Sequence, residues 1–125
     1  SSTILARVGA ARLFTLSLLT ATVRWALLSR VTSATLILCL QPLHGVTFGL
    51  FWVSAVTLVR DRGHVAPTAS QGLFAAALGT GSLIGMNVSG RLLEAGGGPL
   101  LYGMAATCAA MASLCASVYV RRARL

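Results

Sequence analysis

Residues 38–52 read LCLQPLHGVTFGLFW, and this stretch decides the fold because it lies in an apolar run too long for an ordinary soluble domain. No Asp, Glu, Lys or Arg occurs within 31–59, within 63–90 or within 95–120. Each of these segments exceeds the roughly 20 residues that cross a hydrocarbon core of about 30 Å. The sequence therefore predicts an all-α integral membrane protein.

The composition of the whole chain agrees with this prediction. Hydrophobic residues make up 56% and charged residues 10%, with a mean hydropathy of +0.83, whereas soluble domains carry about 25% charged residues. The net charge of +8 does not indicate nucleic-acid binding, because the arginines separate the apolar runs and form no basic patch with interleaved aromatics. The three cysteines lie inside apolar segments, where we expect reduced packing residues.

We expect four transmembrane helices, over residues 13–29, 36–59, 69–93 and 99–120. Thr68 and Gln71 have the spacing of a capping box that would start the third helix. The triplet at 96–98 is all glycine and breaks the chain, and Pro99 suits the first turn of the fourth helix because its missing N–H needs no partner there.

Four crossings place both termini on one side of the membrane. Positively charged residues favour the cytoplasmic side, so the counts on the two sides predict that both termini are cytoplasmic. Seven arginines fall on the terminal side and two on the other, namely Arg7, Arg12, Arg60, Arg62, Arg121, Arg122 and Arg124 against Arg30 and Arg91.

The polar residues of the opening stretch point to a lined cavity. Gln41, His44 and Phe48 recur at helical spacing and share one face. Pro42 removes a backbone hydrogen bond and clashes with the carbonyl of Leu38, which kinks a helix. Ionisable residues at membrane depth are commonly functional, so His44 and Gln41 are candidate ligands of a substrate. Histidine also titrates near neutral pH and is a candidate proton carrier. The alternative is a histidine satisfied by a neighbouring helix.

Arg24 is a second anomaly, because it lies about 9 Å below Arg30 along the first predicted helix. One interpretation is that its side chain extends to the outer interface. The other is that it faces the cavity. The chain has two acidic residues, Asp61 and Glu94, and neither is expected at its depth. A cavity-facing Arg24 therefore favours a carboxylate-bearing substrate, such as an aromatic acid.

Other polar and aromatic residues are weaker candidates. Trp52 is either a stacking partner for an aromatic ligand or an interfacial anchor. Gln71 is assigned to the cap or to gating, and Asn87 to a hydrogen bond across helices. Phe48 and Trp52, with Gln71 and Asn87, make up our candidate cavity or gating set.

Small residues recur every four positions on the predicted helices. Such ridges let helix backbones approach closely in lipid. We assign a helix-packing role to four glycines, Gly45, Gly49, Gly81 and Gly85.

The order of LHGVTFGLFW, a basic loop, PTASQGLFAA and a glycine-rich helix ending in SGRLLEAGG resembles the last third of a major facilitator superfamily transporter. The chain is most similar to the branch of phenylpropionate permeases and, more distantly, lactose permeases. The resemblance implies helices nine to twelve of a twelve-helix carrier in a bacterial inner membrane, with the remaining helices N-terminal to this chain. It also implies alternating access, usually driven by proton symport, with the substrate site near the bilayer midplane.

The resemblance also implies roles for individual residues. Arg24 and His44 fall where lactose permeases carry an arginine and a histidine at the proton and sugar site. Thr47 stands where those proteins have a glutamate, which argues against a galactoside as substrate.

Two other interpretations are weaker. A small four-helix oligomeric transporter would need a membrane-embedded acid, which the chain lacks, and a non-transporting membrane subunit would not need the polar face around His44. We expect no enzyme, because the sequence has no nucleophile–base spacing and no cluster of metal ligands. No cofactor and no metal are expected. The expected partners are the lipid bilayer, a small-molecule substrate and a proton.

Overall fold

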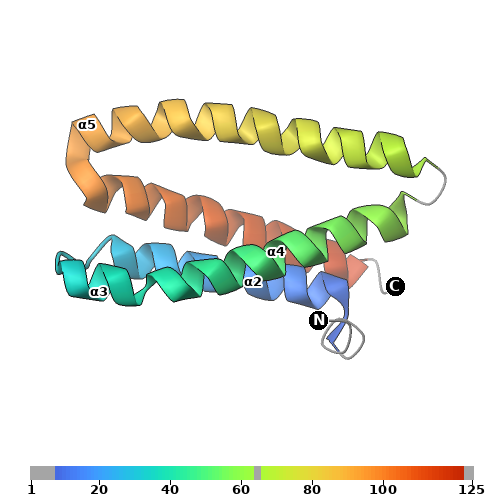
Figure 1. Cartoon of the computed structure of the whole chain (residues 1–125), viewed down its shortest axis with the longest axis horizontal. Helices are drawn as coiled ribbons and strands as arrows, with labels where there is room; N and C mark the ends of the chain where they lie inside the picture. The colour runs from blue at the N-terminus through green and yellow to red at the C-terminus, as the bar shows by residue number, and fades with distance from the viewer. Residues whose placement is uncertain (1–7, 64–65, 123–125) are drawn as a thin grey trace.

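The computed structural model describes residues 8–63 and 66–122, and within these ranges the chain is helical with no strand (Figure 1). This confirms the all-α prediction. The elements are α2 (Ala10–Leu28), α3 (Ala34–Cys39), α4 (Gln41–Arg62) and α5 (Pro67–Arg122). Three helical segments in the described ranges are long and apolar enough to cross a membrane, namely Ala10–Leu28, Ala34–Arg62 and Pro67–Arg121.

The last of these segments is folded back on itself at Gly97, as Figure 1 shows at the left end of α5. Gly97 has φ 67° and ψ −164°, a region of backbone space open essentially only to glycine. Beside it, a Cβ on Gly96 would lie 2.7 Å from the Leu100 side chain. We call residues 67–96 the first arm and residues 98–122 the second arm. Each arm exceeds the roughly 20 residues of one crossing.

The helix that carries the opening stretch is interrupted next to its proline. α3 ends at Cys39, α4 begins at Gln41, and Pro42 lies in the first turn of α4. Leu40 between them donates its N–H to the carbonyls of both Leu36 and Ile37, at 3.1 and 3.2 Å. The missing N–H of Pro42 thus costs the helix one regular bond, and the two pieces still run on in the same direction (Figure 1).

The first turn of α5 differs from the prediction. The helix begins at Pro67, so Thr68 is already helical and cannot be its cap. Proline suits the first helical position because its φ is fixed and no N–H is left unpaired. The capping box of Thr68 and Gln71 was therefore wrong, because the helix begins two residues earlier than it predicted. The preceding loop is tight, since a Cβ on Gly63 would lie 2.8 Å from the Val59 carbonyl oxygen.

α2 lies at the centre of the packed part of the molecule. It contacts both α4 and α5, and its buried residues are Leu13, Ser17, Arg24 and Leu28. Trp25 of α2 stacks on Tyr102, so the neighbour on the α5 side is the second arm. We refer to α2, α4 and the second arm as the packed helices. One contact of the first arm with these helices is made by Phe74, whose ring centroid lies 5.9 Å from that of Trp52.

The glycines assigned to helix packing do not meet a helix in the described residues. Gly45, Gly49, Gly81 and Gly85 are exposed, and nothing lies within 4 Å of a Cβ built on any of them. Their packing role stays a prediction for contacts beyond this part of the chain. The three cysteines are free, as expected, and exposed, so their packing role also stays a prediction.

Candidate functional site

A cavity of about 120 Å³ lies between α2 and α4. Both helices contribute polar and apolar side chains to it. The residues that line it are Ser17, Leu18, Ala21, Arg24 and Trp25 from α2, with His44, Thr47, Phe48 and Phe51 from α4. Two candidates from the sequence, Arg24 and His44, therefore line one cavity.

Arg24 is the most unusual group in this cavity. It is 4% exposed, and its Nε has no hydrogen-bond partner. One terminal nitrogen, Nη2, donates to Oε1 of Gln41 at 3.5 Å, the long limit for such a bond. The guanidinium also lies over the Trp25 ring, 4.5 Å from its centroid. The Arg24 side chain is buried and lines the cavity between α2 and α4, and its role in binding a substrate stays a prediction.

Gln41 owes its position to the helix break. As the first residue of α4 it stands just after Leu40, and its side-chain oxygen reaches across to Arg24 of α2. The structure thus brings Arg24 together with both Gln41 and His44. A neutral amide oxygen carries only a partial charge, so it does not neutralise the guanidinium.

His44 stands on the cavity wall with an aromatic neighbour. Its ring centroid lies 6.0 Å from that of Phe48. One turn further on, the buried Thr47 donates its hydroxyl to the carbonyls of Leu43 and His44, at 2.9 and 3.0 Å. Because its hydrogen is used within the helix, Thr47 offers a substrate only an acceptor.

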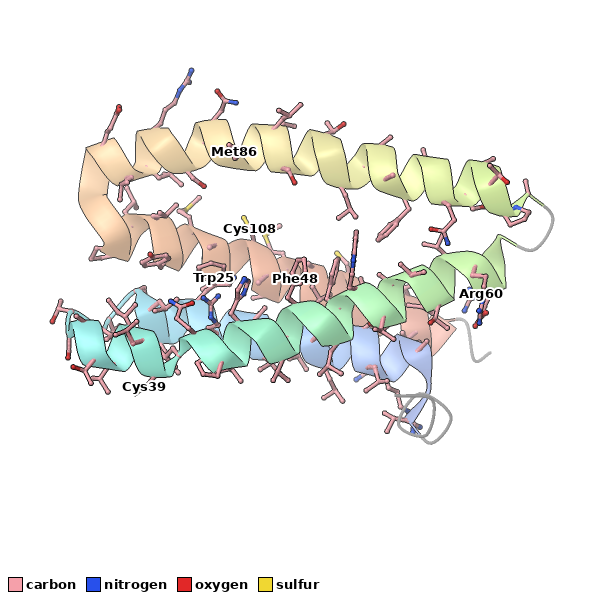
Figure 2. All side chains as sticks on the ribbon, in the orientation of Figure 1. Trp25, Cys39, Phe48, Arg60, Met86 and Cys108 are labelled. Carbon is pink, nitrogen blue, oxygen red and sulfur yellow. The ribbon has the colours of Figure 1, made fainter. Side chains whose placement is uncertain are left out.

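Aromatic side chains continue from the cavity in two directions. Phe48 and Trp52 stack at 6.1 Å and lead to Phe74 of the first arm. At the other side, Trp25 and Tyr102 stack with centroids 5.6 Å apart and planes 19° apart. Figure 2 shows Trp25 and Phe48 on the side of α2 and α4 that faces α5. Phe48 lines the cavity, whereas Trp52 continues the row beyond it.

Two other candidates lie away from this cavity. Asn87 is exposed on the first arm, where its amide nitrogen donates to the Leu83 carbonyl at 2.8 Å. Its hydrogen bond thus stays within one helix and does not cross to another. Gln71 also lies on the first arm, within its first two turns, and does not line the cavity. The structure does not bring either residue to Arg24.

Ser17 and Ala21 are cavity residues that the sequence analysis did not single out. Ser17 is 1% exposed and precedes Arg24 by two helical turns, and Ala21 precedes it by one. The signal was present, because residues three, four and seven apart share a helix face. This spacing identifies Ser17 and Ala21 only if Arg24 is first assumed to face the cavity.

No acidic side chain in the described residues lies at the cavity. Asp61 forms an ion pair with Arg60 at 3.5 Å at the end of α4, and Glu94 is exposed near the end of the first arm. The described residues also contain no group of three His, Cys, Asp or Glu side chains that would hold a metal ion. The cavity is therefore cationic, with one titratable histidine and aromatic walls.

Comparison with known proteins identifies the family. No curated protein and no solved structure matches the chain. The model of the MFS_1 like family matches residues 1–104, a span that contains all the residues lining the cavity, the whole first arm and the start of the second arm. With its apolar helices, the match identifies a multi-pass membrane protein of the transporter class. The chain belongs to the MFS_1 like family, within the major facilitator superfamily.

Proposed function

We propose that this chain supplies the anion-binding part of a substrate site in a secondary transporter. The solute is a small carboxylate, it moves by alternating access, and protons drive it. The observation that carries the proposal is Arg24, which is 4% exposed with one nitrogen unpartnered.

A buried guanidinium without a counter-charge is unstable. Desolvating such an ion costs several kcal/mol unless an opposite charge and hydrogen bonds compensate for it. Arg24 has an amide oxygen and an aromatic face as its partners. A carboxylate offers two oxygens in the geometry that a guanidinium binds in a bidentate manner. A carboxylate solute would therefore supply the charge that the described residues lack.

The size of the cavity indicates that it is one part of a larger site. Ligand pockets usually measure about 300–1,000 Å³, whereas this one measures about 120 Å³. We infer that other helices of the transporter complete it, as they would if these are helices nine to twelve of a twelve-helix carrier.

The walls favour an aromatic acid over a purely aliphatic one. Phe48, Phe51 and Trp25 all line the cavity beside Arg24. Aromatic pairs gain about 0.5–1.5 kcal/mol beyond their buried area. A carboxylate on Arg24 would place an attached ring against these walls.

His44 is the group that we assign to proton coupling. It lines the same cavity as Arg24, and histidine changes its charge in the physiological pH range. Protonation there would add a second positive charge beside a bound anion, which links the binding of the proton to that of the solute.

We also propose a bacterial inner membrane, with both termini in the cytoplasm. The start of α2, the end of α4 and the end of α5 lie at one end of the molecule (Figure 1). Arg12, Arg60, Arg62 and Arg121 are exposed at that end, and Arg30 and Arg91 belong to the other. Such an imbalance favours a cytoplasmic location for the richer end.

The experiment is uptake of labelled aromatic carboxylates into vesicles that contain the complete transporter, with and without an imposed proton gradient. Arg24→Gln should lower uptake at least about a hundredfold, since breaking a buried ion pair costs about 3–5 kcal/mol. Arg24→Lys should retain part of it.

The matched control is Arg30→Gln, six residues further along and exposed, which should stay within about twofold of the unmodified protein because surface changes have small effects. Unchanged uptake in Arg24→Gln would contradict the carboxylate proposal. If the imposed proton gradient did not change the accumulation of the solute, only the proposed proton coupling would be contradicted.

A further inference from the structure

A second, larger cavity lies between the start of α2 and the end of the second arm. Its volume is about 370 Å³, and two exposed arginines stand at it, one from each helix. Its lining residues are Val8, Arg12, Thr15, Leu16, Ser117, Val120 and Arg121. It is separate from the cavity of Arg24, with which it shares no residue.

We propose that this cavity binds an anionic phospholipid, with the phosphate on the two arginines and an acyl chain against the apolar wall. The proposal does not depend on the transported solute or on proton coupling.

The charge at the cavity favours an anion. Arg12 and Arg121 are the charged side chains among the described residues that line it, and no acidic side chain accompanies them there. Arginine binds phosphate oxygens in a bidentate manner. Basic pockets between helices at the cytoplasmic membrane face suit lipid head groups.

The hydroxyl groups beside the arginines are not free to donate hydrogen bonds to a phosphate. Thr15 donates its hydroxyl hydrogen to the Ala11 carbonyl at 3.0 Å, and Ser117 donates to the Ser113 carbonyl at 2.8 Å. Among the described lining side chains, the two guanidinium groups are therefore the donors that remain for a phosphate.

The depth of the groups favours a lipid over a soluble phosphate. Arg12 is in the first turn of α2 and Arg121 in the last turn of α5, so both stand at the end of a membrane-spanning segment. Leu16 and Ser117 lie one turn deeper, about 6 Å along each axis at about 1.5 Å per residue. The charged groups thus lie at the level of the lipid head groups. The apolar wall, which includes the 49% exposed Leu16, faces the hydrocarbon.

The test is direct binding of lipid to the purified complete transporter in neutral detergent. The probes are phosphatidylglycerol and phosphatidylcholine with the same fluorescent acyl chain, and the quantity measured is the ratio of their dissociation constants. The unmodified protein should prefer phosphatidylglycerol. Arg12→Gln and Arg121→Gln should each lower this preference about fivefold, since one basic residue near a charged membrane contributes about 1 kcal/mol.

The matched control is Arg60→Gln, an exposed arginine at the same end that lies outside the cavity. It should change the preference less than twofold, and an equal loss would show general attraction to a basic surface and overturn the proposal. Binding of phosphatidylcholine should stay unchanged in the two cavity variants, which shows that they are folded.

Two further outcomes would also overturn the proposal. One is equal affinity for the two lipids in the unmodified protein, which would mean a groove filled by any lipid or by polypeptide. The other is displacement of phosphatidylglycerol by millimolar glycerol phosphate, which would mean a site for a soluble anion. Leu16→Trp places a larger side chain in the apolar part of the cavity and keeps both arginines. It should weaken the binding of both lipids.

Discussion

The two arms of α5 are joined at a single residue and are both apolar, yet they are packed very differently. On the second arm, Ser113 is 2% exposed and Tyr102 stacks on Trp25. On the first arm, every residue from 79 to 88 is exposed. Hydropathy thus indicates that a helix lies in the membrane, but it does not indicate which neighbour the helix packs against. In lipid, that choice depends on small residues, hydrogen bonds and close packing.

The largest expected effect compares a leucine of the packed helices with one of the first arm. Leu28 is 4% exposed and Leu83 is 67% exposed. Leu28→Ala should lower the free energy of unfolding by about 2–5 kcal/mol because it leaves a cavity, whereas Leu83→Ala should stay within about 0.5 kcal/mol. The measurement is unfolding of the purified transporter in detergent by a graded denaturant. Equal losses would show that the first arm is packed as tightly as α2 in the complete protein.

A smaller effect is expected when a serine is enlarged on each arm. Ser113→Leu inserts bulk between packed helices and should cost about 1–3 kcal/mol. Ser82→Leu adds the same side chain at an exposed position of the first arm and should be nearly neutral. Both can be read from the temperature at which the detergent-solubilised protein aggregates. A destabilising Ser82→Leu would locate a partner helix on that face, in agreement with the packing role predicted for Gly81 and Gly85.

The smallest expected effect concerns a contact between the end of α4 and the end of the second arm. Arg62 donates from Nη1 to the hydroxyl of Tyr119 at 2.5 Å, and its guanidinium lies 5.3 Å from the centre of that ring. Tyr119→Phe removes the hydrogen bond and should cost about 0.5–1 kcal/mol. Tyr119→Leu also removes the ring and should cost about 0.5–1 kcal/mol more. Identical unfolding curves for all three proteins would show that the contact contributes nothing to stability.

The features that the sequence predicted well are those set by local covalent chemistry. Pro42 lacks an N–H, and the helix is interrupted at Leu40 near it, although the two pieces keep the same direction and show no sharp kink (Figure 1). Within the glycine triplet, Gly97 has a backbone conformation that other residues avoid. Arg24 and His44 were chosen because polar groups are costly at membrane depth; both line one cavity, and their role in binding stays a prediction. In each case one residue type and its immediate neighbours carried the information.

The features that it did not predict depend on how helices are rotated against one another. The contact of Arg24 with Gln41 requires a particular rotation of α2 about its axis, and no spacing within either helix determines it. The same holds for the glycines of the first arm, whose ridge is regular but faces no described helix. The prediction that Thr68 caps the helix was wrong for another reason, because Pro67 occupies the first helical position.

The turn at Gly97 has a mechanical consequence. Because the connection between the two arms is so short, they share one end in every conformation of the protein. Any displacement of the first arm must therefore keep this shared end, while its other end stays tied to α4 through the short connection from Arg62 to Pro67. The arm extends about 45 Å at about 1.5 Å per residue, so the part farthest from both attachments is its exposed middle, residues 79–88.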